Sequence, residues 1–242
     1  DIMGISEKSI RSSNVGNFFS RISYKRPLTS YSKVQILVSR MIRGRAFHIN
    51  RVAIQTKEYL DLGCGPNTHE NFINLDYGWR PGMDVCWDLT KALPLDDSTV
   101  RGVFSEHCLE HLPFASVDSV LQEVYRILKP GGRIRIVVPD GELYLKRYTE
   151  LINERGGEPL PYANSDKYQG FYSPIMSVNR IFRAHGHQFI YDFMTFNILL
   201  EKNGFVGVTR EMYNVGGDPI LLIDTPSRAV ESLYVEALKP EQ

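Results

Sequence analysis

The sequence predicts an α/β fold built on a mostly parallel, doubly wound sheet of seven strands. Short apolar runs alternate with helical patterns from Tyr59 onward, as such a fold requires. No segment repeats at intervals of about 20 to 50 residues, so a solenoid is excluded. The chain has 242 residues, 43% of them hydrophobic and 23% charged, which is enough to bury one large core. The predicted strands are 59–62, 72–76, 83–87, 100–105, 134–138, 205–210 and 233–237.

Three segments carry helical patterns. The first spans 117–128 and ends at Lys129-Pro130-Gly131-Gly132, where proline and glycine stop a helix. The second is expected over 191–203 with Gly204 as its cap, and the third around 34–41. Apolar residues recur at helical spacing in the first segment and predict a face that packs on the sheet: Val117, Val120, Leu121, Val124, Ile127 and Leu128.

Charge separates an N-terminal arm, residues 1–57, from the body of the chain, residues 58–242. The arm holds eleven basic and two acidic residues and carries +9, so the body carries −9. A basic, partly helical arm can dock on its own body, meet a partner's acidic surface, or hold a phosphate-bearing substrate. The sequence leaves these three roles open.

Residues 141–190, the insertion, interrupt the alternation of strands and helices. Insertions at the ligand face usually select the substrate, so we expect this segment to form a lid. Its aromatic residues form either stacking walls for a substrate ring or the lid's own core: Tyr144, Tyr148, Tyr162, Tyr168, Phe171 and Tyr172.

Two classes of protein are disfavoured by composition. The longest strongly apolar stretch, 193–200, is far shorter than the roughly 20 residues that cross a bilayer, so no transmembrane segment is predicted. Cys64, Cys86 and Cys108 form no C-x-x-C pair, so neither a disulfide framework nor a zinc knuckle is indicated. We therefore expect a cytoplasmic protein in a reducing compartment.

The predicted strands end in small or polar residues. In an open parallel sheet the ligand binds beyond the carboxyl ends of the strands. We therefore expect one crevice to be faced by Gly63, Asp76, Asp88, Ser105 and Asp140.

The motif Asp61-Leu62-Gly63-Cys64-Gly65 follows the first strand. Its glycines allow a sharp turn and the close approach of a ligand. A dinucleotide site is disfavoured because Thr68 stands where a third glycine belongs and Asp76 follows Gly63 too soon. A triphosphate-binding loop is excluded because no Gly-Lys-Ser/Thr follows.

With this turn, three further motifs make the chain similar to the class I S-adenosylmethionine-dependent methyltransferases. The resemblance covers roughly 58–140 and implies a Rossmann-like sheet. The short first crossover and the ending 232–237 resemble a subgroup found among bacterial surface-polysaccharide and sugar-modifying genes. The motifs are Leu93-Pro94-Leu95-Asp96-Asp97-Ser98, His107-Cys108-Leu109-Glu110-His111-Leu112 and 123–132.

The resemblance implies a set of residues that bind S-adenosylmethionine. The turn from Asp61 to Gly65 would lie under the methionine part, and Asp76 would accept hydrogen bonds from the ribose hydroxyls, as an ionised carboxylate can. Asp88 and Leu89 would face the adenine, and Ser105 the sulfonium. The predicted cofactor-binding residues are Asp61, Gly63, Cys64, Gly65, Asp76, Asp88, Leu89 and Ser105.

Four histidines are expected at the crevice: His107, His111, His185 and His187. A hydroxyl acceptor gains from a general base, and His187 in the insertion is the first choice, although it could merely anchor the insertion. His107 and Asp140 are the other catalytic candidates, the alternative for Asp140 being a turn-initiating residue.

His107, Glu110 and His111 lie at i, i+3 and i+4 and share one helical face. This arrangement resembles a metal-binding helix of some relatives, but the Leu-Glu-His sequence also occurs in metal-free ones. A divalent metal therefore stays open without being favoured.

We expect the chain to transfer a methyl group from S-adenosylmethionine to a hydroxyl of a sugar, a glycolipid or a similar small molecule. Two alternatives stay open: a cofactor-binding partner subunit without activity, and a methyltransferase that acts on nucleic acid or protein. Nucleic acid is not favoured, because the arm contains no recognisable binding module. A homo-oligomer is compatible with the sequence.

Overall fold

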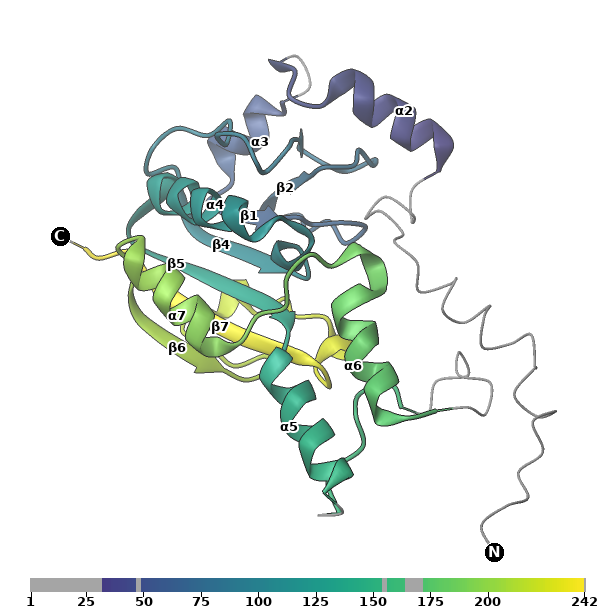
Figure 1. Ribbon diagram of the computed structural model, residues 1–242. Helices are drawn as coiled ribbons and strands as arrows, with labels where there is room; N and C mark the ends of the chain where they lie inside the picture. The colour runs from purple at the N-terminus through teal and green to yellow at the C-terminus, as the bar shows by residue number, and fades with distance from the viewer. Residues whose placement is uncertain (1–31, 47–48, 154–155, 164–171, 242) are drawn as a thin grey trace, which may run out of the picture.

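The computed structural model describes residues 32–46, 49–153, 156–163 and 172–241 (Figure 1). Its centre is a seven-stranded sheet in the order β3-β2-β1-β4-β5-β7-β6. The first five strands are parallel, and β7 runs antiparallel between β5 and β6. This confirms the predicted α/β class and strand number. The strands are β1 (Tyr59–Leu62), β2 (Phe72–Asp76), β3 (Val85–Cys86), β4 (Val100–Glu106), β5 (Leu128–Pro139), β6 (Val206–Glu211) and β7 (Ser232–Leu238).

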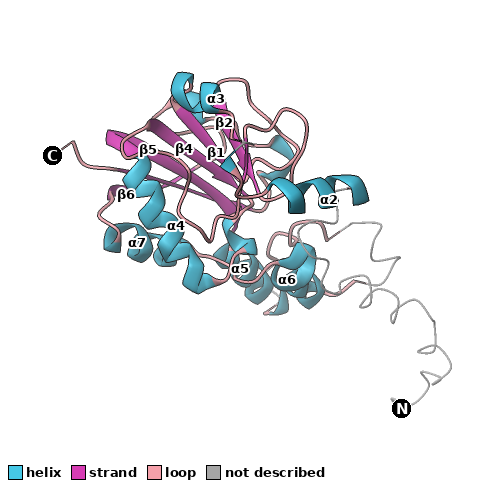
Figure 2. Ribbon diagram, turned by 90° about the horizontal axis from the view of Figure 1, so that it is seen from above, coloured by secondary structure: helices cyan, strands magenta, loops and turns pink. Residues whose placement is uncertain are grey.

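The α-helices of the described residues are α2 (Lys33–Ile42), α3 (Arg51–Thr56), α4 (Phe114–Ile127), α5 (Gly141–Ile152), α6 (Pro174–Arg183) and α7 (Phe193–Lys202). Figure 2 shows α4 and α7 side by side along the sheet. The crossovers 63–71, 77–84 and 87–99 contain no α-helix. The loops beyond β1, β2 and β3 are therefore irregular segments that can surround a ligand.

The two faces of the sheet have different cores. On β1, Leu60 and Leu62 belong to the large core shared with α4 and α7, so the intervening Asp61 points to the other face. That second face holds a smaller core, completed by Leu221 of the short 3-10 helix η6 (Pro219–Leu221). A buried carboxylate therefore lies at the ligand end of a strand whose other side is fully apolar.

Strand β5 begins earlier than the sequence predicts. It starts at Leu128, directly after α4, and includes the Lys129-Pro130-Gly131-Gly132 motif that was expected only to end the helix. Gly131 has a φ of +73°, and its backbone N–H donates to the carbonyl of Lys239. The motif thus ends the helix and joins the neighbouring C-terminal chain within one turn. Strand β3 is shorter than predicted, with two residues.

The insertion forms a helical pair, α5 and α6. Tyr144 packs with Leu160 and Ile181 in a core of its own, with Tyr148 at its edge. Tyr144 and Tyr148 are therefore part of the insertion's core, while Tyr144 also reaches the cavity described below. Tyr168 and Phe171 lie outside the described residues.

The described part of the arm docks on the loop between β2 and β3. Ser39 of α2 is buried, and its hydroxyl accepts a hydrogen bond from the backbone N–H of Trp79. Arg43 donates to the carbonyl of Tyr77, and Lys57 pairs with the buried Asp84 at 2.9 Å. Residues 1–31 of the predicted arm lie outside the described residues. Among the helices that are described, none has the length and apolar character needed to cross a bilayer.

Candidate active site

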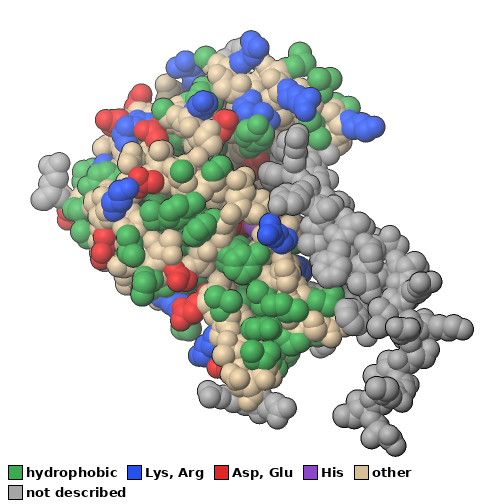
Figure 3. Space-filling model, in the orientation of Figure 1, with side chains coloured by type: hydrophobic (Ala, Val, Ile, Leu, Met, Phe, Trp, Pro, Cys, Tyr) green, Lys and Arg blue, Asp and Glu red, His purple; other side chains and the backbone are tan. Residues whose placement is uncertain are grey.

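A cavity of about 920 Å³ lies beyond the carboxyl ends of β1, β2 and β4. In Figure 1 the arrowheads of β4 and β5 point toward α6, which forms part of its wall. The arm contributes Arg40 and Arg43 to the wall, the insertion contributes Arg180 and His187, and the segment before β7 contributes further residues. Figure 3 shows Lys and Arg side chains gathered over α2 and α3. The cavity is therefore enclosed by a basic arm, the strand ends and the insertion.

The glycine turn forms the floor of the cavity. Gly63 has a φ of +86° and Gly65 a φ of +56°, a region that L-residues rarely adopt. A Cβ at Gly63 would lie 2.3 Å from Sγ of Cys108, whereas a Cβ at Gly65 would meet nothing within 4 Å. Gly63 thus allows a close packing contact, and Gly65 leaves space for a ligand. Cys64 also lines the cavity, and burial raises the pKa of its thiol.

Three carboxylates surround the floor. Asp61 is buried, and desolvation, followed by the negative charges of Asp76 and Glu106, raises its pKa well above the ordinary value. Asp76 accepts the backbone N–H of Gly65 at 2.9 Å and that of Gly78 at 2.8 Å. No Lys or Arg forms an ion pair with Asp61 in the described part of the chain. This end of the cavity is therefore suited to a positively charged ligand.

Asp88 and Leu89 also line the cavity, after β3. One oxygen of Asp88 accepts the backbone N–H of Thr90 at 3.0 Å and its hydroxyl at 2.8 Å. These bonds orient the carboxylate at the strand end. Seven of the eight residues predicted to bind the cofactor thus line one cavity.

Ser105, the eighth, does not line the cavity, which corrects the expected placement. Its hydroxyl is buried and donates to the carbonyl of Leu62 at 2.9 Å. Side chains alternate along a strand, so its neighbours Phe104 and Glu106 face the cavity instead. The sequence did not lead us to expect Glu106 at the cavity. The alternation of side chains along β4 could have indicated it, because Phe104 and Glu106 share one face of the strand.

Asp140, which was expected to face the crevice, is likewise not among the residues that line the cavity. Its carboxylate caps α5 by accepting the N–H of Leu143 at 3.1 Å, and it pairs with Arg210 at 2.5 Å. Its position as the N-terminal cap of α5 agrees with the alternative given for it above, a residue that starts a turn. The four predicted histidines, in contrast, all line the cavity.

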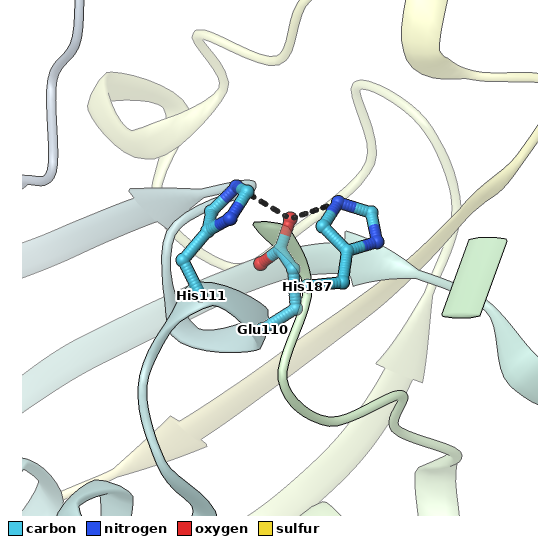
Figure 4. A group of neighbouring side chains, drawn as sticks. All are labelled: Glu110, His111 and His187. Carbon is cyan, nitrogen blue, oxygen red and sulfur yellow. Dashed lines mark ion pairs between the residues drawn. The ribbon is translucent and has the colours of Figure 1, made fainter. Parts of the chain in front are cut away.

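Three of these histidines surround the carboxyl group of Glu110, and Figure 4 shows two of them, His111 and His187. Oε1 of Glu110 lies 3.4 Å from Nδ1 of His107, 3.8 Å from Nε2 of His111 and 4.0 Å from Nε2 of His187. Glu110 is fully buried, yet neither of its carboxylate oxygens accepts a hydrogen bond. The predicted helical face from 107 to 111 is instead a 3-10 turn, η3 (Leu109–His111), preceded by His107 with a φ of +48°.

Burial controls protonation in this histidine cluster. It raises the pKa of Glu110 to about 8 and lowers that of His111 to about 3. It also lowers the pKa values of His107 and His187. The three rings are therefore neutral at pH 7 and carry lone pairs that can accept a proton or bind a cation.

The wall also holds polar groups around Tyr162, which was expected from the sequence as a possible stacking residue. The hydroxyl of Tyr162 donates to Glu231 at 3.1 Å, and the guanidinium of Arg180 lies 4.2 Å above the Tyr162 ring. One terminal nitrogen of Arg180 is buried and makes no hydrogen bond. Arg228 lies 4.0 Å from Glu106. Arg180, Arg228 and Glu231 belong to no motif, so only the folded chain brings them together.

Comparison with known proteins gives one family match. The family described as "Methyltransferase domain" matches residues 75–136, which include β4 and α4. No curated protein matches the chain in sequence.

Several solved structures resemble the chain weakly. An S-adenosylmethionine-dependent methyltransferase from Archaeoglobus fulgidus is 17% identical over 85% of this chain and 94% of its own, with a TM-score of 0.45. A methyltransferase from Thermotoga maritima, described as a possible histamine N-methyltransferase, is 16% identical over 92% and 99%, with a TM-score of 0.46. Haemonchus contortus phosphoethanolamine N-methyltransferase 2, in complex with S-adenosyl-L-methionine, is 13% identical over 89% and 60%, with a TM-score of 0.44.

Proposed function

We propose that the chain is a class I S-adenosylmethionine-dependent methyltransferase, which the match of residues 75–136 to a methyltransferase domain supports, and that it methylates a hydroxyl of a sugar, a glycolipid or a similar small molecule. The observation that carries the proposal is the division of the cavity into two ends. One end holds carboxylates around an open glycine turn, and the other holds histidines, arginines and hydroxyl groups.

The carboxylate end fits the cofactor. When bound, S-adenosylmethionine supplies a methyl group on a positively charged sulfur and also carries an ammonium group and a ribose diol. The open space at Gly65 admits such a ligand, and Asp76 at the end of β2 is placed to accept from the diol. A cation there lowers the cost of ionising Asp61, whose pKa is raised in the ligand-free chain. We assign Asp61, Gly63, Cys64, Gly65, Asp76, Asp88 and Leu89 to this subsite.

The other end supports a hydroxyl-rich acceptor with an anionic group. Tyr162, Gln188 and Glu231 line it with donors and acceptors of hydrogen bonds. Arg180 offers a buried nitrogen without a hydrogen-bond partner, and Arg228 lies close by in the same wall. An acceptor that carries a phosphate or a carboxylate, such as a nucleotide sugar or a glycolipid, would complete these interactions.

The histidine cluster supports a hydroxyl as the methylated group, because a hydroxyl must lose its proton to be methylated. Nδ1 of His187 lies 2.6 Å from the carbonyl of Ile181 and therefore carries the ring proton. Its Nε2 keeps the lone pair on the side of Glu110. In the metal-free protein we propose Nε2 of His187 as the base, and His107, held at 2.9 Å from Ser232, as the next candidate.

A turnover assay over an acceptor panel tests this function. The purified chain is incubated with S-adenosylmethionine and with sugars, nucleotide sugars, glycolipids, RNA or protein, and release of S-adenosylhomocysteine is measured. We expect turnover with a hydroxyl acceptor. Turnover only on RNA or protein refutes the acceptor class. Cofactor binding without turnover on any acceptor indicates a partner subunit without activity.

The variant His187→Gln tests the proposed base. We expect it to lose turnover while keeping its affinity for S-adenosylmethionine, measured by calorimetry. Unchanged turnover would exclude His187 from the reaction. Thermal unfolding of the variant shows whether the protein that has lost turnover is still folded.

A further inference from the structure

We propose that Glu110, His111 and His187 form a binding site for one divalent transition-metal ion, with the remaining coordination positions open to the acceptor end of the cavity. Two imidazoles and one carboxylate are a donor set that zinc, manganese, cobalt and iron accept. One ligand atom from each residue lies within 4.8 Å of the others. The part of the proposal that concerns the acceptor rests on the proposed function, whereas the metal site does not.

The first observation is the state of the Glu110 carboxylate. It is completely buried, and both oxygens lack a hydrogen-bond partner, although buried polar atoms are almost always paired. No Lys or Arg forms an ion pair with it among the described residues. Leaving the oxygens of a buried carboxyl group without a partner costs free energy, and a cation bound to them would offset that cost.

The second observation is the orientation of the two rings. His187 is fixed by the contact between its Nδ1 and the carbonyl of Ile181 at 2.6 Å, which leaves Nε2 as the unprotonated nitrogen. Histidines that bind metals usually donate their other ring N–H to such a partner. Nε2 of His111 also faces Glu110, at 3.8 Å. The lone pairs of both rings can thus converge on the same carboxylate oxygen (Figure 4).

The ligand atoms must move closer together to bind one ion. Metal–nitrogen and metal–oxygen bonds are about 2.0–2.2 Å long, so two ligand atoms on one ion lie about 3–3.5 Å apart. The observed separations from Oε1 of Glu110 are 3.8 Å to His111 and 4.0 Å to His187, and all three ligand atoms lie within 4.8 Å of one another. Side-chain rotations that shorten these separations by up to about 1 Å close the gap. His107, at 3.4 Å from the same oxygen, is placed to hold the carboxylate in position.

Access to the site comes from the cavity. His111 and His187 both line it, whereas Glu110 lies behind them. Three protein ligands leave one or more positions for other donors, as in catalytic metal sites. We infer that the acceptor's hydroxyl occupies such a position.

A bound ion changes how the acceptor loses its proton. Coordination of Nε2 removes the lone pair that would make His187 a base. The acceptor's O–H bond then breaks while its oxygen is bound to the ion, and the proton leaves to water. The oxygen forms a bond to the methyl carbon as the carbon–sulfur bond breaks, and the sulfonium becomes a neutral thioether. The ion favours the deprotonated oxygen, as it favours deprotonated water.

Metal binding can be measured without any acceptor. The full chain is dialysed separately against Zn²⁺, Mn²⁺ or Co²⁺, and bound metal is counted per chain, with the visible absorption of Co²⁺ reporting nitrogen and oxygen ligands. We expect about one ion per chain. In Glu110→Gln and His187→Gln we expect affinity to fall roughly 100-fold or more, at least as much as the loss of a supporting contact.

The matched control is His69→Gln. His69 lines the same cavity, but its ring packs on Phe72 with centroids 5.7 Å apart, away from the cluster. We expect this variant to bind metal as the unmodified chain does. If Glu110→Gln fails to fold, His187→Gln carries the comparison, with thermal unfolding as the check on folding.

Three results overturn the site: no bound metal in the unmodified chain, unchanged binding in both variants, or an equal loss in the His69 control. Failure of the proposed function looks different, because metal then binds while no hydroxyl acceptor is methylated. If an acceptor is still fully methylated after a chelator has removed the metal, the ion takes no part in the reaction.

Discussion

The variant Gly65→Ala tests whether the glycine turn exists to admit a ligand. Gly65 has a φ of +56°, and a Cβ at this position meets no protein atom within 4 Å. Since Gly65 lines the cavity, the added methyl group enters the space that the cofactor would use. The substitution therefore has two separate effects, one on folding and one on binding.

The first effect is backbone strain. An L-residue in the left-handed region costs about 1–2 kcal/mol, and no steric clash with the protein adds to it. The second effect is overpacking against the bound cofactor, which costs about 1–3 kcal/mol in tightly packed sites. This corresponds to a roughly 5- to 150-fold loss of affinity for S-adenosylmethionine.

The control is Gly156→Ala. Gly156 has a φ of +64°, a Cβ there also meets nothing within 4 Å, and it does not line the cavity. Urea unfolding should show the same loss of stability in both variants, while calorimetry should show weaker cofactor binding only in Gly65→Ala. Equal cofactor affinity in the two variants would refute the assignment of this turn.

Three further predictions concern buried charges. Asp61→Asn should raise the thermal unfolding midpoint of the ligand-free chain and weaken S-adenosylmethionine binding about 10-fold or more in calorimetry, because a charged hydrogen-bond partner is lost. Because the pKa of Asp61 is raised in the folded chain, Asp61 lowers the free energy of unfolding as pH rises above about 3.9, where it ionises in the unfolded chain. Below that pH the cost is absent, so the advantage of Asp61→Asn over the unmodified chain should vanish in acid. Arg135→Met should lower the free energy of unfolding in urea by about 3–5 kcal/mol, because it leaves the buried carboxylates of Asp224 and Glu236 without their cation. Asp140→Ala should lower the free energy of unfolding by about 1–2 kcal/mol, because the N-terminal cap of α5 is lost. If the variant folds and binds the cofactor but has lost turnover, Asp140 becomes a candidate for the base again.

The framework could be predicted from the sequence because it follows periodic patterns. The apolar positions predicted for α4, from Val117 to Ile127, are the ones that the structure buries. Strands β1 and β2 have the predicted bounds. In both cases a single buried face sets the pattern, and local spacing is enough to find it.

The acceptor end could not be predicted in the same way. Ser105 and Glu106 are adjacent in sequence, yet strand parity places only Glu106 in the cavity. The contact between Glu110 and His187 joins residues far apart in the chain, and only the docking of the insertion brings them together. Arg180 and Arg228 have no sequence signature, because their roles depend on what they face.

The treatment of buried carboxylates distinguishes structure from function in this chain. Where burial serves folding, the charge is matched: Arg135 contacts Asp224 at 2.5 Å and Glu236 at 2.9 Å, all three buried. Asp61 and Glu110 are buried without an ion pair to Lys or Arg among the described residues, and burial raises the pKa of each. Since ionising either carboxyl group without a cation beside it costs free energy, a cation that arrives from outside would stabilise the ionised form. We expect the sulfonium of the cofactor to bind at the open turn beside Asp61 and a metal ion to bind at the imidazoles around Glu110. In both cases the same reasoning, a buried carboxyl group without a matching cation, leads to the assignment.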